Sequence, residues 1–432
     1  MIRANVIRLA VIGFGLIVCG KYSSAYAADV ELLNPLGPVS SEEVKKLEAR
    51  VPFTELGRPR SYYLAGSEEL DENEMRVIAL GSSNPRVQRA QVASCWLIEL
   101  GNGDSFIFDI GTRCTINMSL LEVPWDKFTK VFISHLHADH FGDLPALLAD
   151  GWDMGRSIPI EVWGPNGAQP ELGTKAAVKH LLGMFRWDYV SKLGRGDMLS
   201  YAIKVHEFDF SREQTIYERN GVTIKSWPAV HTIDGAVSYS LEWNGLKLSY
   251  SGDTVQNKWF LKHAKNSDMV IHECSSPLEE LIEARNFPPE AAWIILRTAH
   301  TQPRQAAEVF EALQPRMAVC FHYVDDGVDK REKLYANVVK RYDSGAFIIA
   351  KDMMVWNVTP EMIRVRMVVG GDHNANSLPR AQEPPDKSKL IEPSKWVTEG
   401  LEMKEIYREL LNGLKPEHQR RILKHVPKEH LP

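Results

Sequence analysis

The chain has 432 residues, of which 44% are hydrophobic and 25% are charged, and its formal net charge is −5. A chain of this length and composition can bury a large core, and no stretch after the N-terminus is apolar enough to span a bilayer, which excludes a membrane-embedded body. The acidic balance argues against a polyanionic partner, because nucleic-acid-binding proteins usually present a basic face. A local basic patch stays compatible with these values.

The first 27 residues have the three parts of a secretory signal peptide. Arg3 and Arg8 provide a basic start, residues 9–20 form an apolar run, and residues 25–27 (A-Y-A) supply the small side chains of a cleavage site. The sequence therefore predicts cleavage after Ala27 and a periplasmic or secreted mature protein. Cleavage removes three basic and no acidic residues, so the formal net charge falls from −5 to −8.

Two weaker alternatives concern the same segment. A membrane anchor needs an apolar run of ~20 residues, which is longer than residues 9–20. A lipoprotein would carry its lipid on Cys19, but Val18 stands where a lipobox has a small residue. We therefore expect no membrane attachment after signal cleavage.

Residues 28–70 form an N-terminal lead-in. Ser40 and Glu43 have the spacing of a capping box, which predicts a short helix over residues 44–51. Nothing in this segment indicates a function.

Between residues 71 and 356, short apolar runs alternate with helical stretches. The runs are bounded by Gly, Asn, Asp or Pro and have the length and composition of β-strands. They occupy residues 75–80, 95–100, 105–110, 130–134, 160–163, 222–227, 237–243, 246–251, 269–272, 317–321 and 347–350. Helices are expected at 141–151, 175–185 and 304–313. Two strand series with interleaved helices are typical of an α/β protein built as a four-layer αββα sandwich.

The composition changes in residues 357–432. A Pro- and charge-rich stretch, residues 381–395, is followed by a polar amphipathic segment over residues 398–424. This pattern predicts a C-terminal helical extension, which either packs on the core or mediates a homodimer.

Four cysteines remain after signal cleavage, namely Cys95, Cys114, Cys274 and Cys320. In an oxidising compartment they could pair in three ways. Their irregular spacing favours buried free thiols over a disulfide framework, although the sequence does not determine the disulfide state. None of them lies in a zinc-ribbon C-x-x-C pattern.

A dense group of candidate metal ligands follows the predicted strand at 130–134. The strand leads directly into H-x-H-x-D-H, which places His135, His137, Asp139 and His140 within six residues. Zinc accepts imidazole and carboxylate ligands in catalytic sites, and a strand-to-helix loop can fold them around a bimetal centre. A lone histidine is more often a solvated or core side chain, but this density of ligands indicates a metal site.

H-x-H-x-D-H after an apolar strand resembles the signature of the metallo-β-lactamase superfamily. Further motifs of that family follow in order, with His231 in A-V-H-T, Asp253 in S-G-D-T and His322 in F-H-Y. Asp109 in F-D-I-G resembles the acidic residue that supports a metal-bound histidine. The resemblance covers about residues 75–356 and implies the metallo-β-lactamase fold.

The resemblance also implies a ligand set for two zinc ions per chain, with manganese or iron as alternatives. The first ion would take His135, His137 and His231, the second would take Asp139, His140 and His322, and Asp253 would bridge them. The implied reaction is hydrolysis, because a pair of ions can activate water and polarise the substrate.

Several details are similar to the tRNase Z and arylsulfatase branch of the superfamily and to tRNase Z-like class B3 metallo-β-lactamases. These are A-L-G-S-S at 79–83, V-W-G-P at 162–165, I-H-E at 271–273 and His300-Thr301 before a helix. The sequence departs from class B1 and B2 enzymes, which have a cysteine in place of Asp253. It also lacks the long Gly- and Pro-rich arm of tRNase Z.

Three residues receive further roles. The resemblance implies that His300 is the acid that protonates the leaving group. A helix N-terminus by itself disfavours imidazolium, however, so an unaided His300 would stay neutral and could donate a hydrogen bond to an oxyanion. A capping or packing role for His300 is the alternative. Asp139 is expected to be catalytic as well as a ligand, and His272 is expected to support the site from a strand end.

The sequence leaves several functions open. The first is cleavage of phosphodiester or related ester bonds, including 3′-tRNA endonuclease-type activity at an RNA 3′ end. The second is opening of β-lactam antibiotics, and the third is arylsulfatase or lactonase activity on a small ester. A non-catalytic metal-binding protein is the alternative from another class, and the complete ligand set argues against it.

Overall fold

The computed structural model describes residues 30–32, 58, 61–195, 198–370, 386, 388–391, 394, 396 and 409–424. The predicted signal peptide and the predicted helix at 44–51 lie outside these residues. By internal contacts the chain divides into two compact units, one made of Met1–Trp187 with Asp197–Gln382 and one made of Asp188–Gly196 with Glu383–Pro432. In the described part of the chain, no helix combines the length and the hydropathy of a transmembrane span.

The first unit contains two β-sheets. The larger sheet has the order β1-β17-β16-β3-β4-β5-β6-β7-β8, and β2 pairs with β17. Its strands are β1 (Val30–Leu32), β2 (Tyr62–Leu64), β3 (Met75–Gly81), β4 (Cys95–Leu100), β5 (Ser105–Ile110), β6 (Lys130–Phe132), β7 (Ile160–Pro165), β8 (Ile203–Phe208), β16 (Met354–Val358) and β17 (Ile363–Val369). This sheet therefore includes residues from both segments that flank 71–356.

The smaller sheet has the order β15-β14-β13-β12-β11-β10-β9. Its strands are β9 (Gln214–Arg219), β10 (Val222–Pro228), β11 (Val237–Trp243), β12 (Leu246–Tyr250), β13 (Met269–Glu273), β14 (Met317–Phe321) and β15 (Phe347–Ile349). Strands β12 to β15 are parallel to one another. Their carboxyl ends therefore lie at one edge of the sheet.

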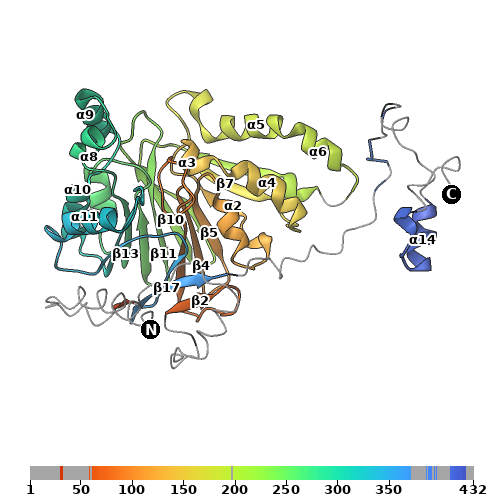
Figure 1. Ribbon diagram of the computed structural model, residues 1–432, viewed down its shortest axis with the longest axis horizontal. Coiled ribbons are helices and arrows are strands. Elements are labelled where there is room, and N and C mark those ends of the chain that lie inside the picture. The colour runs from red at the N-terminus through yellow and green to blue at the C-terminus, as the bar shows by residue number, and fades with distance from the viewer. Residues whose placement is uncertain are drawn as a thin grey trace, which may run out of the picture. The chain divides into compact units, whose positions relative to one another are not determined.

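Helices cover the outer face of each sheet (Figure 1). On the first sheet lie α2 (Cys114–Ser119), α4 (Leu144–Asp153) and α5 (Thr174–Met184), and on the second lie α7 (Lys258–His263), α10 (Pro303–Leu313) and α11 (Val328–Val339). The other described helices of residues 61–370 are α3 (Ala138–Phe141), α6 (Arg186–Lys192), α8 (Leu278–Glu283) and α9 (Pro289–Thr298). In the C-terminal extension the structure describes α14 (Pro416–Leu423).

Three apolar cores separate four layers. One core lies between the sheets and joins Trp96 and Phe108 to Tyr239 and Phe321. A second packs the outer face of the first sheet against its helices, and a third does the same for the second sheet. The predicted αββα sandwich is confirmed.

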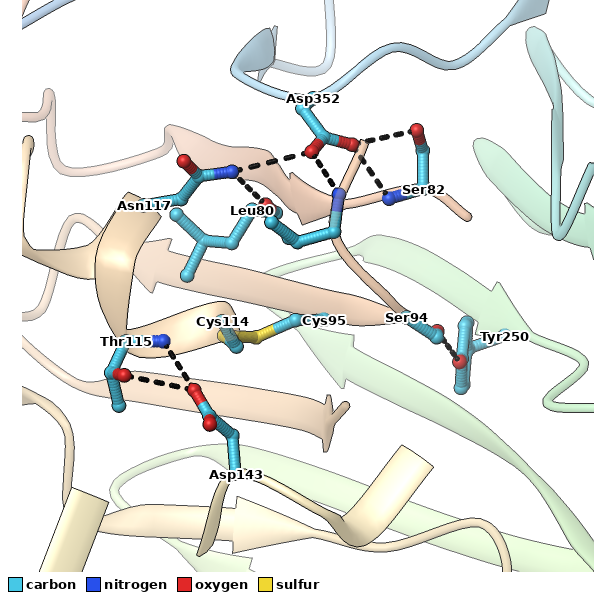
Figure 2. Close-up of a disulfide and its surroundings, with 11 residues drawn as sticks. Leu80, Ser82, Ser94, Cys95, Cys114, Thr115, Asn117, Asp143, Tyr250 and Asp352 are labelled. Carbon is cyan, nitrogen blue, oxygen red and sulfur yellow. Dashed lines mark hydrogen bonds between the residues drawn. A yellow bond between two sulfur atoms is a disulfide. The ribbon is translucent and has the colours of Figure 1, made fainter. Parts of the chain in front are cut away.

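The cysteine prediction is wrong, because the structure contains disulfides between Cys95 and Cys114 and between Cys274 and Cys320. Spacing along the chain does not reveal these pairs, since the sheets bring the partners together. Cys95 lies on β4 next to the end of β5, and Cys114 begins the helix that follows β5. Cys274 follows β13, and its amide donates to Phe321 of the neighbouring strand β14. Figure 2 shows the first pair.

Candidate metal centre

The predicted ligands lie at the carboxyl ends of strands from both sheets. His135 and His137 follow β6, and Asp139 and His140 lie in the single turn of α3. From the second sheet, His231 follows β10, Asp253 follows β12 and His322 follows β14 directly. The structure brings all seven residues together.

Four of them form a first group, which comprises His135, His137, His231 and Asp253. Nδ1 of His137 lies 3.0 Å from Nε2 of His135 and 3.0 Å from Nε2 of His231. Oδ2 of Asp253 lies 3.8 Å from each of those two Nε2 atoms. The ligand atoms are within 4.8 Å of one another, so one ion could contact all of them.

A second group shares Asp253 and adds Asp139, His140 and His322. Nε2 of His322 lies 3.1 Å from Oδ2 of Asp139 and 3.1 Å from Oδ2 of Asp253. Nε2 of His140 lies 3.2 Å from Oδ1 of Asp253. Burial would raise the pKa of Asp253, but His140 and His322 outweigh it and hold that pKa well below its usual range. Asp253 is therefore a carboxylate that faces both groups.

Unpartnered polar atoms at this point fit a metal. Nε2 of His140 and Oδ1 of Asp253 are buried and make no hydrogen bond with any described residue, although they face each other. Buried polar groups normally have partners, because an unmade hydrogen bond is costly. Imidazole and carboxylate donors at this spacing suit a divalent ion such as zinc.

Asp109 supports this arrangement as expected from its position at the end of β5. Its Oδ2 accepts hydrogen bonds from Nδ1 of His140 (2.6 Å), Oγ of Ser134 (2.7 Å) and Oη of Tyr250 (2.6 Å), and its Oδ1 accepts from the amide of Ser134 (2.7 Å). The bond to Nδ1 orients the ring of His140 so that Nε2 faces Asp139 and Asp253. With a metal ion bound, the same bond would keep the ring proton on Nδ1 and leave Nε2 as the ligand atom.

His300 lies next to the second group, between α9 and α10. Its Nδ1 donates to Oε2 of Glu273 at 3.0 Å. Burial alone would lower the pKa of His300, but the adjacent Glu273 carboxylate outweighs this effect and raises the pKa to about 9. The helix-terminus argument for a neutral His300 therefore does not hold here, because Glu273 stabilises the imidazolium.

Glu273 has a role that the I-H-E motif was not expected to give it, since the predicted supporting residue was its neighbour, His272. The structure corrects this. His272 packs against Phe260 on the helix side of β13, and its Nδ1 contacts only the carbonyl of Glu273. Strand alternation explains the difference, because Ile271 lies in the core between the sheets, so Glu273 points to the same side while His272 points away. Applying this alternation to I-H-E would have identified Glu273.

The chain is similar in sequence to several known proteins. Residues 75–284 match the family model described as Anti-Pycsar protein Apyc1. The chain is 25% identical to a Ribonuclease Z of Mycolicibacterium gilvum over 255 residues, which cover 58% of this chain and 84% of that protein. It is 23% identical to a Ribonuclease Z of Methanocaldococcus jannaschii over 317 residues, which cover 60% of this chain and 90% of that protein.

Among solved structures, similar chains include the metallo-β-lactamase fold protein YhfI of Bacillus subtilis, with 18% identity, a TM-score of 0.49, and coverage of 66% of this chain and 100% of that chain. Another is human tRNase Z, short form, with 19% identity, a TM-score of 0.49, and coverage of 65% of this chain and 98% of that chain.

The αββα layers, the His and Asp groups at the strand ends and the similarity to proteins named Ribonuclease Z support a metal-dependent hydrolase of the metallo-β-lactamase superfamily. Within that superfamily the chain is tRNase Z-like.

Proposed function

We propose that the protein is an exported, dinuclear zinc-dependent hydrolase that cleaves phosphodiester or related ester bonds. The observation that carries this proposal is that two four-residue ligand groups have only Asp253 in common. A third group of possible ligands overlaps the second, because it joins Asp253 and His322 to Glu273 and His300. A shared carboxylate between two such groups is the arrangement expected for two neighbouring ions, whereas a single ion would leave one group unused.

The residues divide between the ions as follows. His135, His137 and His231 would hold one ion, Asp139, His140 and His322 would hold the other, and Asp253 would contact both. The chemistry that two such ions supply when bound is activation of water near neutral pH and polarisation of a phosphoryl or carbonyl oxygen.

His300 and Glu273 would complete the reaction by protonating the leaving group. Nδ1 of His300 is held by Glu273, and its Nε2 makes no hydrogen bond with a described residue, so that nitrogen can face a substrate. An imidazolium whose pKa is about 9 carries the proton at neutral pH. This proton matters most for an alkoxide leaving group, such as the one that departs from an RNA phosphodiester.

The substrate class rests on the similarity to proteins named Ribonuclease Z. Cleavage at an RNA 3′ end is the second candidate within this class, and the same similarity favours it. Removal of residues 1–27 takes away three basic residues and lowers the formal net charge from −5 to −8. This negative charge favours a small phosphodiester over a long RNA.

Export to the periplasm or the medium is part of the proposal. It is supported by the signal-like residues 1–27 and by the two disulfides, since disulfides persist mainly in oxidising compartments.

The test is turnover by the purified chain that begins at Ala28. We would compare a bis-aryl phosphate, a precursor tRNA, a chromogenic cephalosporin and an aryl sulfate, each with added zinc and with a chelator. Zinc-dependent cleavage of a phosphodiester is the expected result. Turnover of the cephalosporin or the sulfate alone, or turnover that survives the chelator, would reject the proposed activity.

A further inference from the structure

His322 has a backbone conformation that needs support. Its φ is +62°, in the left-handed region that non-glycine residues seldom adopt. It follows β14 directly, and its amide donates to the carbonyl of Ser82 at 2.8 Å. The direction of the His322 ring, and so its place in the second ligand group, depends on this turn.

The segment that supports the turn lies between β15 and β16. The amide of Ala350 donates to Cys320 at 2.8 Å, and Oη of Tyr323 donates to Ala350 at 2.9 Å. Two residues after Ala350, Oδ1 of Asp352 accepts from the amide of Ser82 at 2.9 Å and from its hydroxyl at 2.8 Å. Asp352 therefore fixes the residue whose carbonyl holds His322.

Asp352 also accepts hydrogen bonds from two neighbouring segments. Its Oδ2 accepts from the amide of Val92 at 2.6 Å and from Nδ2 of Asn117 at 3.3 Å. Figure 2 shows this carboxylate between Asn117 on α2 and Ser82 at the end of β3. Burial raises the pKa of Asp352 to about 7, so its role does not depend on a full negative charge. Its two oxygens accept four hydrogen bonds from three segments and thereby link these segments at one point.

A second path runs from Ser82 to the far side of the turn. Oγ of Ser82 accepts from Nε2 of Gln91 at 3.0 Å, and Oε1 of Gln91 accepts from the amide of Asp325 at 2.8 Å. The residues on both sides of His322 are thus connected to Asp352 through Ser82.

We propose that Asp352 is a positioning residue that holds His322 in the metal centre through Ser82. The inference rests on the proposed two-ion function, because it assigns Asp352 to the ion held by Asp139, His140 and His322. The other ion depends on residues from β6 and β10, which Asp352 does not contact.

The test is a chelator-competition titration with zinc that yields two dissociation constants, together with the unfolding midpoint measured by circular dichroism. In Asp352→Asn the NH₂ group replaces one carboxylate oxygen, so it faces the donors of either Ser82 or Val92 and those hydrogen bonds are lost. Partners outside the ligand shell typically change metal affinity by about 10- to 100-fold. We expect the affinity for the ion held by Asp139, His140 and His322 to fall about tenfold or more. The affinity for the ion held by His135, His137 and His231 should change little.

Asp126→Asn is the matched control. Its carboxylate accepts hydrogen bonds from the amide of Ser157 at 2.7 Å and from the hydroxyl at 3.1 Å, and these bonds hold the segment before β7 rather than the turn at His322. This variant should lower the unfolding midpoint and leave both zinc dissociation constants unchanged. If Asp352→Asn does not fold, Ser82→Ala is measured instead, since it removes the hydroxyl contacts and keeps the backbone bond to His322.

Selective loss of one ion in either Asp352→Asn or Ser82→Ala supports the inference. A folded Asp352→Asn, or Ser82→Ala in its place, with both dissociation constants as in the wild type overturns it. A wild-type chain that binds a single ion contradicts the two-ion proposal instead, so the two failures can be told apart.

Discussion

Asp109→Asn is the most informative change at the edge of the metal centre. The carboxylate accepts four hydrogen bonds, and three of them end on Oδ2, from His140, Ser134 and Tyr250. Asparagine can keep the bond from the Ser134 amide on its oxygen, but then its NH₂ group faces those three donors. The hydroxyls of Ser134 and Tyr250 can rotate, whereas the ring of His140 must change tautomer.

That tautomer change weakens metal binding. If Nδ1 of His140 accepts a hydrogen bond from the asparagine amide, the ring proton must lie on Nε2, which is the nitrogen that faces Asp139 and Asp253. Changes to such partners typically weaken metal affinity about 10- to 100-fold, which corresponds to about 1.4 to 2.7 kcal/mol. The ion held by Asp139, His140 and His322 should lose this amount.

The assay is a zinc titration against a competing chelator, with Tyr250→Phe as the control. That variant removes one of the four hydrogen bonds and leaves the carboxylate and the His140 tautomer unchanged. It should lower the free energy of unfolding by about 0.5 to 1.5 kcal/mol with little effect on metal affinity. Wild-type affinity for both ions in Asp109→Asn would refute the reasoning, and so would selective loss of the ion held by His135, His137 and His231.

Three further predictions concern catalysis, stability and processing. His300→Ala should lower kcat roughly 10²- to 10⁴-fold on alkyl phosphodiesters but little on nitrophenyl esters, with both ions retained, because only a poor leaving group needs the proton; equal losses in steady-state kinetics on both substrates would argue against an acid. Replacing Cys95 and Cys114 together by alanine should lower the free energy of unfolding by about 2 to 4 kcal/mol in a denaturant titration, since the disulfide closes a loop in the unfolded chain; an unchanged midpoint would show that it does not. Mass spectrometry of exported protein should find Ala28 at the N-terminus, and an intact Met1 would contradict signal cleavage.

Much of the second sheet could be predicted from sequence because its strands are short apolar runs with clear ends. β10, β11 and β14 begin where the apolar pattern begins. The pattern gave no signal for β8 and β9, which are edge strands whose side chains are half polar and partly exposed. A strand at an edge needs no continuous apolar run, so hydropathy alone does not reveal it.

In the site, too, residues that are adjacent in the chain could be predicted, whereas contacts between residues far apart in sequence could not. The H-x-H-x-D-H motif identifies four candidate ligands because they are adjacent in the chain. Asp352 and the cysteine pairs act across long sequence separations, and only the strand order places them beside their partners. The sequence therefore indicated the candidate ligands and the supporting Asp109, but it did not indicate Asp352 or Glu273.

Metal stoichiometry of the wild type and of Asp253→Asn tests the central claim most directly. Elemental analysis of the dialysed wild type should find two zinc-like ions per chain, because both ligand groups share Asp253. Asp253→Asn should keep the fold by circular dichroism and lose most of the bound metal, since both groups lose their common carboxylate. A fully active wild type with at most one ion per chain, or an Asp253→Asn variant that retains both ions, would contradict the account.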